Sequence, residues 1–320
     1  MSLQRTASSK LLAGALAGVL AGVLTISLAA APGRARAQGA DYSKVEIQTR
    51  KLNDSTYMLV GAGGNIGLSV GEDAVFLIDD QFAPQAPKLK AAVARITNKP
   101  VQFLLNTHFH FDHTGGNEAF GKDGALIVAH DNVRRRMSSN QLIAMVGSSA
   151  KQDASPKVAL PVVTVSNDIG FNINGEELRA FHVPRAHTDG DLIVHFRKGD
   201  IVHMGDTFFN GMYPFIDSSS GGTADGVVAA ADRVLALAGE QTRIIPGHGP
   251  LAGKADLQAY RDMLATVTQR LKDLRRSGQT DAQIRAAKPS ADFDAKFGNG
   301  FIKPEGFVQM MLDAIPRPGA

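Results

Sequence analysis

The stretch Thr107-His108-Phe109-His110-Phe111-Asp112-His113-Thr114-Gly115-Gly116 places three imidazoles and a carboxylate within six consecutive residues. An apolar run over residues 101–105 precedes it and predicts a short strand, whereas the two glycines interrupt the chain before a helix can begin. The cluster is therefore expected on a loop at the carboxyl end of a strand. In an α/β sheet that edge brings side chains together without requiring them to fill a core.

The spacing of these residues predicts metal binding. His108 and His110 are two residues apart, so in an extended chain both side chains point the same way and can bind one ion. Asp112 and His113 follow after a turn and can reach a second ion. Zinc binds imidazole nitrogen and carboxylate oxygen at about 2.0–2.2 Å, and a catalytic zinc keeps one position open for water. Two ions need more ligands than these four, so further ligands are expected elsewhere in the chain.

This His-x-His-x-Asp-His pattern resembles the signature of the metallo-β-lactamase superfamily. Three later segments resemble the remaining metal-binding positions of that family, in the same order: Pro184-Arg185-Ala186-His187, Met204-Gly205-Asp206-Thr207 and Ile245-Pro246-Gly247-His248. The resemblance covers about residues 55–250. It implies that one ion is bound by His108, His110 and His187, that a second is bound by Asp112, His113 and His248, and that Asp206 bridges the two.

Two parts of the chain share a plan that predicts two similar β/α halves. The first has expected strands over 45–52, 56–61, 65–70 and 74–78, a helix over 84–97 and a strand over 101–105. The second has a strand over 201–205, a helix over 223–238 and a strand over 243–245. The halves are expected to meet along a line that contains all the ligands. The resemblance implies the same α/β architecture, a four-layer αββα sandwich with the metal site at one sheet edge.

The segments between the halves are predicted less directly. Residues 130–145 are expected to form a helix with a solvated triple arginine, and residues 147–160 an irregular flap beside the site. Asp79 or Asp80, at the end of an apolar strand, is expected to accept a hydrogen bond from the free ring nitrogen of a ligand. A further helix with charged exposed positions is expected over 256–276.

An aromatic-rich loop follows Asp206 and is expected to contact the substrate. Phe208, Phe209, Tyr213 and Phe215 suggest an apolar wall, and Tyr213 or Asn210 is a candidate donor to an oxyanion.

Composition and charge limit the function classes. The chain has 320 residues with 44% hydrophobic content, enough for a sizeable core, which excludes disorder. The net charge of +3 comes from the first 37 residues, which contain four basic residues and no acidic one. Without them the net charge is three minus four, or −1. A nucleic-acid partner is therefore not expected.

The first 37 residues resemble a secretory signal peptide. Arg5 and Lys10 precede an apolar run over 11–31, and Ala35-Arg36-Ala37 forms a small-residue cleavage site before Gln38. The mature protein is expected to be one hydrolase domain over 38–320, periplasmic or secreted, without stable membrane association after cleavage. An uncleaved membrane anchor is the alternative. The chain has no cysteine, which is compatible with export because a core of this size needs no disulfides.

These features together predict an exported hydrolase with two metal ions. A hydroxide bridging two zinc ions, or iron or manganese, would attack the carbonyl of a small-molecule ester, lactone, thioester or amide, with Asp112 orienting the hydroxide. The absence of cysteine and the aspartate at 206 resemble glyoxalase-like and lactonase-like members of the family. The alternatives are a zinc β-lactamase with only His and Asp ligands, a di-iron redox enzyme or dioxygenase, and a metal-stabilised binding module without turnover. The sequence contains no signal for an oligomeric state.

Overall fold

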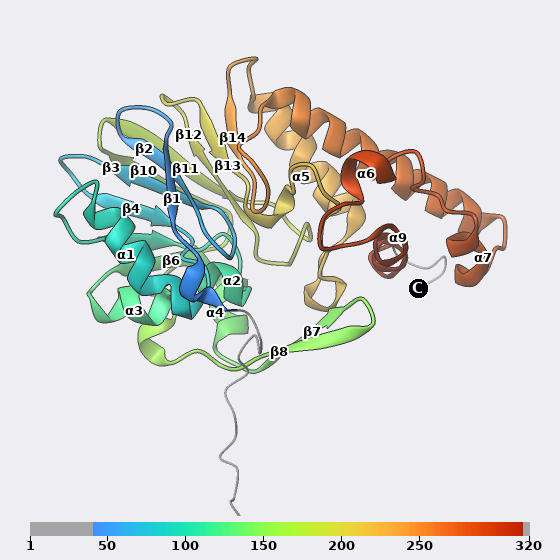
Figure 1. Cartoon of the computed structure of the whole chain (residues 1–320), viewed down its shortest axis with the longest axis horizontal. Helices are drawn as coiled ribbons and strands as arrows, with labels where there is room; N and C mark the ends of the chain where they lie inside the picture. Colours follow the sequence, from blue (N-terminus) through green and yellow to red (C-terminus); the bar gives the residue numbers. More distant parts are fainter. Residues whose placement is uncertain (1–40, 316–320) are drawn as a thin grey trace, which may run out of the picture. The chain divides into compact units, whose positions relative to one another are not determined.

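Short runs of apolar and β-branched residues form two facing sheets in the computed structural model, which describes residues 41–315 (Figure 1). The first sheet has the order β1-β2-β3-β4-β5-β6-β9 and the second the order β10-β11-β12-β13-β14. The strands of the first are β1 (Gln48–Lys51), β2 (Thr56–Val60), β3 (Ile66–Val70), β4 (Val75–Ile78), β5 (Phe103–Leu105), β6 (Leu126–His130) and β9 (Val163–Val165). Those of the second are β10 (Asp168–Ile173), β11 (Glu176–His182), β12 (Leu192–Phe196), β13 (Ile201–His203) and β14 (Arg243–Ile245).

The two sheets repeat one topology. In the first, β2, β3 and β4 form an antiparallel meander, and β5 lies parallel to β4 after the crossover helix α1 (Ala86–Ala94). In the second, β11, β12 and β13 form the meander, and β14 lies parallel to β13 after α5 (Ala224–Leu237). The sequence prediction of two similar β/α halves is therefore confirmed.

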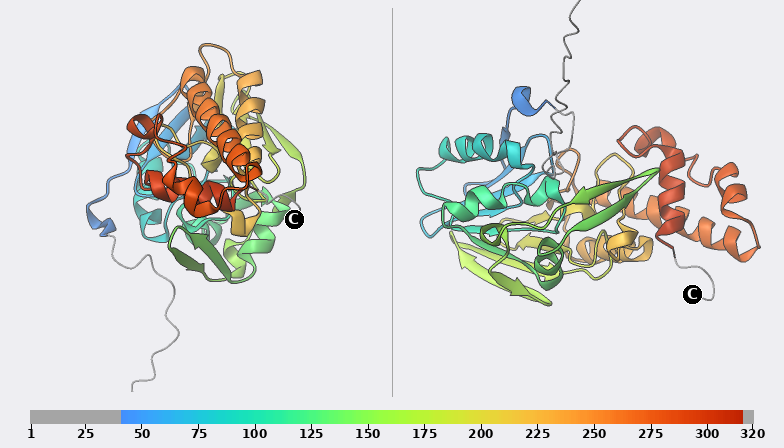
Figure 2. Two further views of the ribbon diagram at one scale, coloured as in Figure 1. Left: turned by 90° about the vertical axis from the view of Figure 1, so that its right-hand side faces the viewer. Right: turned by 90° about the horizontal axis from the view of Figure 1, so that it is seen from below.

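Three apolar cores stack these elements into layers (Figure 2). The middle core lies between the sheets, where Phe76 of the first packs with Leu178 of the second. The outer face of the first sheet packs on α1 and α3 (Asn117–Lys122) through Leu89 and Phe120, and α5 and α6 (Lys254–Arg276) pack in the core beside the second sheet. These layers confirm the αββα sandwich. The other α-helices are α2 (Phe111–Thr114), α4 (Asp131–Met137), α7 (Asp281–Ala286), α8 (Asp294–Phe297) and α9 (Pro304–Asp313).

The segment after β6 differs from the sequence prediction. Helix α4 ends at Met137, because the polar run Ser138-Ser139-Asn140 competes for its backbone hydrogen bonds. The chain then forms β7 (Gln141–Met145), which pairs antiparallel with β8 (Ser148–Gln152) through a turn in which Gly147 has a φ of 72°. The prediction of one helix over 130–145 is wrong, and the segment expected to be irregular begins as a strand.

The expected signal peptide, residues 1–37, lies outside the described residues. Within residues 41–315, no helix combines the length and the apolar character needed to cross a bilayer. The described residues, 41–315, all belong to one compact unit.

Candidate metal centre

The expected ligands lie in loops and short turns at the carboxyl ends of strands. Because β4, β5 and β6 are parallel, as are β13 and β14, their carboxyl ends meet at a shared edge of each sheet. The loop after β5 contains His108 and His110, and α2 follows at once with Asp112 and His113. The loops after β11, β13 and β14 contain His187, Asp206 and His248 respectively.

His108, His110 and His187 form the first cluster, here named the three-histidine group. Nδ1 of His110 lies 3.2 Å from Nε2 of His108 and 2.9 Å from Nε2 of His187. Ligand atoms about 2.1 Å from a tetrahedral zinc lie about 3.4 Å from one another, so these separations fit three nitrogens around one ion. All three side chains are buried.

Asp112, His113 and His248 form the second cluster, here named the mixed group. The two Nε2 atoms lie 3.4 Å apart. Oδ2 of Asp112 lies 3.3 Å from Nε2 of His248 and 3.7 Å from Nε2 of His113. The Asp112 and His248 side chains remain 20% and 21% exposed, so this group opens toward solvent.

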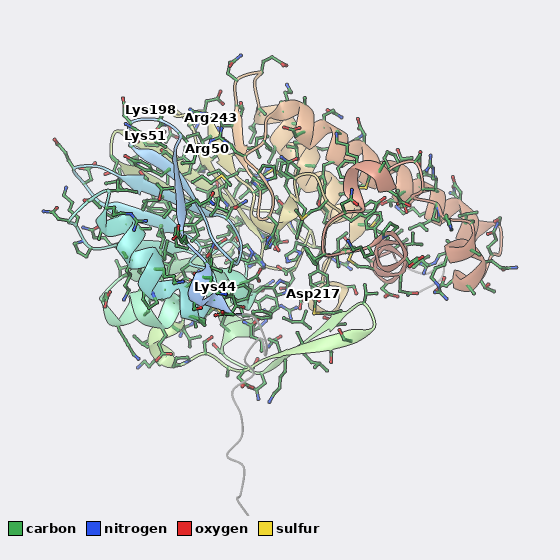
Figure 3. The ribbon with its side chains drawn as sticks, viewed as in Figure 1. Lys44, Arg50, Lys51, Lys198, Asp217 and Arg243 are labelled. Atoms are coloured by element: carbon green, nitrogen blue, oxygen red, sulfur yellow. The ribbon has the colours of Figure 1, made fainter. Side chains whose placement is uncertain are left out.

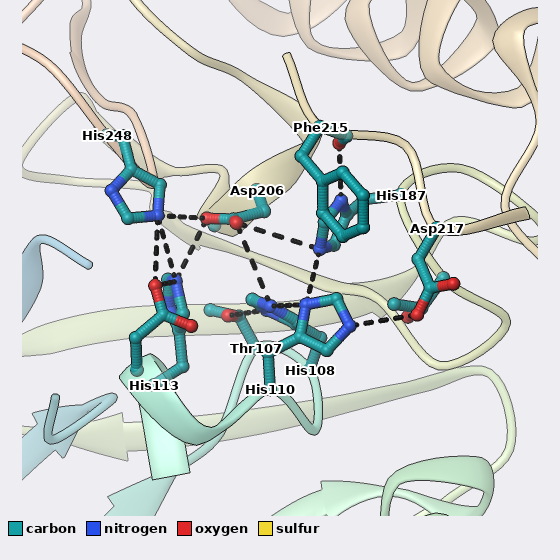
Figure 4. A network of polar contacts seen from close by, with 12 residues as sticks. Thr107, His108, His110, His113, His187, Asp206, Phe215, Asp217 and His248 are labelled. Atoms are coloured by element: carbon teal, nitrogen blue, oxygen red, sulfur yellow. Dashed lines mark hydrogen bonds and ion pairs between the residues drawn. The ribbon is translucent and has the colours of Figure 1, made fainter. Parts of the chain in front are cut away.

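Asp206 lies between the two groups and presents one oxygen to each (Figure 4). Its Oδ2 lies 3.6 Å from Nε2 of His187, whereas its Oδ1 lies 3.0 Å from Nε2 of His113. Oδ1 is buried and accepts no well-aligned hydrogen bond from residues 41–315. A buried carboxylate oxygen without such a partner fits a metal ligand, because a cation would satisfy it. Gly247 permits this approach, since a Cβ there would lie 2.0 Å from Oδ1.

Each imidazole of the three-histidine group donates its remaining ring N–H to a fixed partner. Asp217 Oδ2 accepts from Nε2 of His110 at 3.0 Å, and the Phe215 carbonyl accepts from Nδ1 of His187 at 2.8 Å. The Thr107 hydroxyl lies 3.1 Å from Nδ1 of His108 and donates its own hydrogen to Asp79, so it must accept from that nitrogen. Such partners fix the tautomer and the ring orientation, leaving the other nitrogen free to bind metal.

The mixed group has fewer such partners. Nδ1 of His113 donates to Asp79 Oδ2 at 2.8 Å, which confirms the expected role of Asp79. Asp80 instead accepts from the Gly116 backbone, and burial raises its pKa well above the usual value. Nδ1 of His248 has no hydrogen bond within the described residues, and its ring stacks on Phe209 at 5.1 Å between centroids.

Asp79 connects the two groups. Its Oδ2 accepts from both His113 and Thr107, and its Oδ1 accepts from the Thr107 backbone at 2.7 Å. Its φ of 63° is in the left-handed region, which non-glycine residues seldom adopt, although aspartate tolerates it better than most, and such backbone is often found at functional sites.

The sequence analysis missed Thr107, the Phe215 carbonyl and Asp217 as partners of the ligands. Asp217 precedes three serines, a pattern typical of a capping residue, and it does accept from the Ser220 backbone. Its second contact, with His110, joins residues 107 positions apart and has no local sequence signal.

The metal-free groups differ in their protonation. Burial lowers the pKa of His187 to about 4 and holds that of His108 well below its usual value. Burial acts in the same direction on His248, but Asp206 and Asp112 outweigh it and raise the pKa to about 9. The pKa of His113 is raised for the same reason, with Asp206 as the strongest opposing group. At neutral pH the mixed group therefore holds protons that a cation would displace.

A family model described as the metallo-beta-lactamase superfamily matches residues 59–254. This chain belongs to that superfamily. The match covers more than half of the chain and includes every ligand named above, and members of the superfamily are typically metal-dependent hydrolases.

Individual relatives resemble parts of this chain at 26% and 28% sequence identity. The chain is 26% identical to a 2,4-dinitroanisole O-demethylase subunit alpha from Nocardioides sp. (strain JS1661) over 44% of this chain and 40% of the relative. It is 28% identical to a hydroxyacylglutathione hydrolase from Pelagibacter ubique (strain HTCC1062) over 47% of this chain and 53% of the relative. The matches thus span about half or less of both relatives.

A solved metallo-beta-lactamase from Pontibacter korlensis has the same fold. It aligns with a TM-score of 0.55 and 18% identity over 69% of this chain and 99% of that chain. This agreement supports the superfamily fold alone.

A cavity of about 300 Å³ lies beside both ligand groups and is named here the metal-side cavity. Its lining includes four of the expected ligands, His110, Asp112, Asp206 and His248, together with apolar residues. The apolar residues are Ala62, Phe82, Phe111, Ile143, Met145, Ala150, Phe215 and Phe301.

The two expected oxyanion donors do not line this cavity. Tyr213 is buried in the core, and its hydroxyl donates to Asp294 at 2.6 Å. The Asn210 amide donates to the Pro250 carbonyl at 3.0 Å. Neither side chain faces this cavity, and their role as oxyanion donors stays a prediction. Of the four aromatic residues of the expected wall, Phe215 lines the cavity, whereas Phe208, Phe209 and Tyr213 do not.

Proposed function

We propose that this protein is a hydrolase that uses two divalent cations, zinc in the first instance, to cleave an ester, lactone, thioester or amide of a small molecule. The observation that supports this most strongly is the placement of Asp206, whose two oxygens face two separate ligand groups. A relative named hydroxyacylglutathione hydrolase supports hydrolysis of an acyl compound, at 28% identity.

The residues present fit such a metal pair. Seven side chains supply histidine nitrogens and carboxylate oxygens, the ligand types that zinc prefers, in two clusters joined by one carboxylate. Ions held there would activate a water as nucleophile and stabilise negative charge on a carbonyl oxygen. The outer partners Thr107, Asp217 and the Phe215 carbonyl hold the three-histidine group in position before substrate arrives.

Asp112 is the residue proposed to transfer protons during the reaction. Burial raises its pKa, but His113 and His248 outweigh this and lower the pKa to about 2, so the carboxylate is ionised at neutral pH. It lines the metal-side cavity with 20% of its side chain exposed. An ionised carboxylate at that place can orient a water and accept its proton, then pass that proton to the leaving group.

Turnover is favoured over a purely structural metal site because the cavity reaches the ligands. A structural zinc is enclosed by its ligands, whereas Asp112 and His248 are partly exposed here. A small molecule could therefore approach the centre from the cavity side.

The proposal is tested by metal analysis together with a substrate panel. Zinc-loaded protein would be assayed on a lactone, a thioester, an aryl ester, a β-lactam and a phosphodiester, with oxygen uptake measured in parallel. We expect hydrolysis of at least one acyl compound, its loss on chelation, and a loss of at least about 10²-fold for Asp112→Asn. Iron in the purified protein with oxygen uptake and no hydrolysis would contradict the proposal and favour the redox alternative.

We also propose export to the periplasm or medium, with cleavage before Gln38. The support is the basic start, the apolar run and the small-residue site of the sequence. Intact-mass measurement on protein from the native host should give a chain beginning near Gln38. A full-length chain in the membrane fraction would favour the anchor.

A further inference from the structure

The metal-side cavity has an apolar wall assembled from distant parts of the chain. Six large apolar side chains line it, namely Phe82, Phe111, Ile143, Met145, Phe215 and Phe301. The described residues around it include no lysine or arginine. Basic residues labelled in Figure 3, such as Lys51, Lys198 and Arg243, lie well away from Asp217 of the site. Apart from the expected metal ligands, the lining therefore offers apolar contact and no lysine or arginine side chain.

The β7–β8 hairpin supplies part of that wall through strand alternation. Ile143 faces inward and is 3% exposed, whereas its neighbour Leu142 faces outward and is 68% exposed. Met145, at the end of β7, and Phe301, after α8, line the cavity while remaining 39% and 55% exposed. Apolar side chains exposed at the edge of an apolar cavity are suited to contact an apolar ligand as it enters.

The charge of the loaded site is balanced by nearby carboxylates. Asp112 and Asp206 are ligands, and Asp79 and Asp217 accept hydrogen bonds from ligand histidines. Two divalent cations bring four positive charges, and these four carboxylates bring four negative ones. The loaded centre therefore has little net charge with which to attract an anion.

From these observations we propose that the metal-side cavity binds the acyl part of the substrate and selects acyl groups that are uncharged and apolar. The inference rests on the proposed function and specifies its substrate class, namely alkyl or aryl acyl compounds without a carboxylate. Penicillins and cephalosporins carry a carboxylate, so they are expected to be poor substrates. A neighbouring groove beyond His248 and Phe301 contains Arg50 and lies outside this proposal.

The size of the cavity sets a limit on the acyl group. At about 300 Å³ it is at the lower end of the range for small-molecule sites. Each methylene that transfers from water into it should raise kcat/KM by about three- to fourfold until the cavity is filled. Replacing a terminal methyl by a carboxylate should reverse that gain, because the charge would lose water without meeting a cation.

A matched pair of esters tests this selectivity. The two are p-nitrophenyl hexanoate and the p-nitrophenyl monoester of adipic acid, which have the same chain length and differ by a terminal carboxylate. We expect kcat/KM for the hexanoate to be larger by at least about 30-fold. Equal rates, or a preference for the adipate, would overturn the inference while leaving hydrolysis intact.

Two variants of β7 test whether the apolar wall of the cavity causes the selectivity. Ile143→Lys places a cation inside the cavity and should shift the hexanoate-to-adipate ratio toward adipate by at least about 10-fold. Leu142→Lys adds the same charge on the outward face and should change the ratio by less than about twofold. If the Ile143 variant does not fold, the more exposed Met145→Lys serves in its place. A ratio unchanged by both inward variants would contradict the assignment.

A binding measurement separates failure of the inference from failure of the proposed function. Hexanohydroxamic acid and adipic acid monohydroxamate share one metal-binding head, and their affinities for zinc-loaded protein can be compared by calorimetry without turnover. If the hexanoyl compound binds more tightly but no ester is cleaved, the result would contradict the hydrolase proposal and support the selectivity of the cavity. Equal binding of the two compounds would overturn the cavity assignment whatever the protein hydrolyses.

Discussion

The three-histidine group and the mixed group have ligands of similar chemistry but differ in how firmly the protein holds them. In the first, every imidazole donates its second ring N–H to a partner, and all three side chains are buried. In the second, Asp79 fixes only His113, while Asp112 and His248 are partly exposed. Outer partners of this kind typically change metal affinity by about 10–100-fold. We therefore expect the first ion to bind more tightly than the second.

The same comparison predicts which step of the reaction each ion would support. A firmly held ion suits polarisation of a carbonyl, which needs fixed geometry, whereas a more open one suits a position where substrate and product exchange. The mixed group is also the one that contains Asp112, the residue proposed to handle protons. Asp206 presents one oxygen to each group, so its removal should weaken both.

The largest effect is expected for Asp206→Ala, which removes an oxygen ligand from both groups. We predict a loss of hydrolysis of at least about 10²-fold and weaker binding of both ions, because the carboxylate sets their separation and their affinity. Zinc competition against a chromophoric chelator measures both affinities, and circular dichroism checks the fold. A folded variant with two tight ions and near-normal turnover would show that Asp206 does not bridge.

Asp217→Ala should weaken the first ion selectively, by about 10–100-fold, because His110 loses the acceptor that orients it. His248→Ala should weaken the second ion selectively. Asp292→Ala, at an exposed ion pair with Arg270, is the matched control and should leave both affinities unchanged. If the Asp217 variant weakened only the second ion, the assignment of the outer partners would be wrong.

The two ions should respond differently to pH. The pKa of His248 is raised to about 9 and that of His113 is also raised, so at pH 7 a second ion must displace protons, and its affinity should rise toward pH 9 by up to about tenfold per pH unit for each proton displaced. Burial lowers the pKa of His187 to about 4, so the three-histidine group is already neutral and its affinity should change little over that range. Calorimetry in buffers of different ionisation enthalpy counts the protons released. Equal proton release on binding of the first and the second ion would contradict the predicted difference in their pH dependence.

The smallest effect on activity is expected for Tyr213→Phe. The hydroxyl lies in the core and donates to Asp294, so its loss should reduce the free energy of unfolding by about 1–3 kcal/mol and change kcat/KM by less than about twofold. Denaturant unfolding and steady-state kinetics measure the two quantities. A large loss of activity without loss of stability would support Tyr213 as an oxyanion donor.

Local spacing was enough to predict part of the molecule. The His-x-His-x-Asp-His run and the strand-ending residues Asp206 and His248 lie together in the structure because parallel strands end at one edge. The halves were predictable because each contains an apolar strand, a helix with apolar residues at helical spacing and a second apolar strand, in the same order.

Contacts between distant segments were not predictable from one sequence. Residues 130–145 contain enough apolar positions for a helix. Residues 141–145 form a hairpin instead, because they pair with residues 148–152. The loop after Asp206 is rich in aromatic residues, but whether a given ring lines the cavity or the core depends on helices near the end of the chain. Tyr213 faces inward because Phe307 of α9 stacks on it at 3.9 Å between centroids.

The central claim, that one carboxylate joins a tightly held and a loosely held metal position, is tested most directly by titrating metal-free protein with zinc under mass spectrometry and calorimetry. The account predicts two equivalents, bound in two phases, with the first tighter by at least about tenfold and the second releasing the protons. Saturation at one equivalent, or two equivalents bound in a single phase with equal affinity and equal proton release, would contradict it.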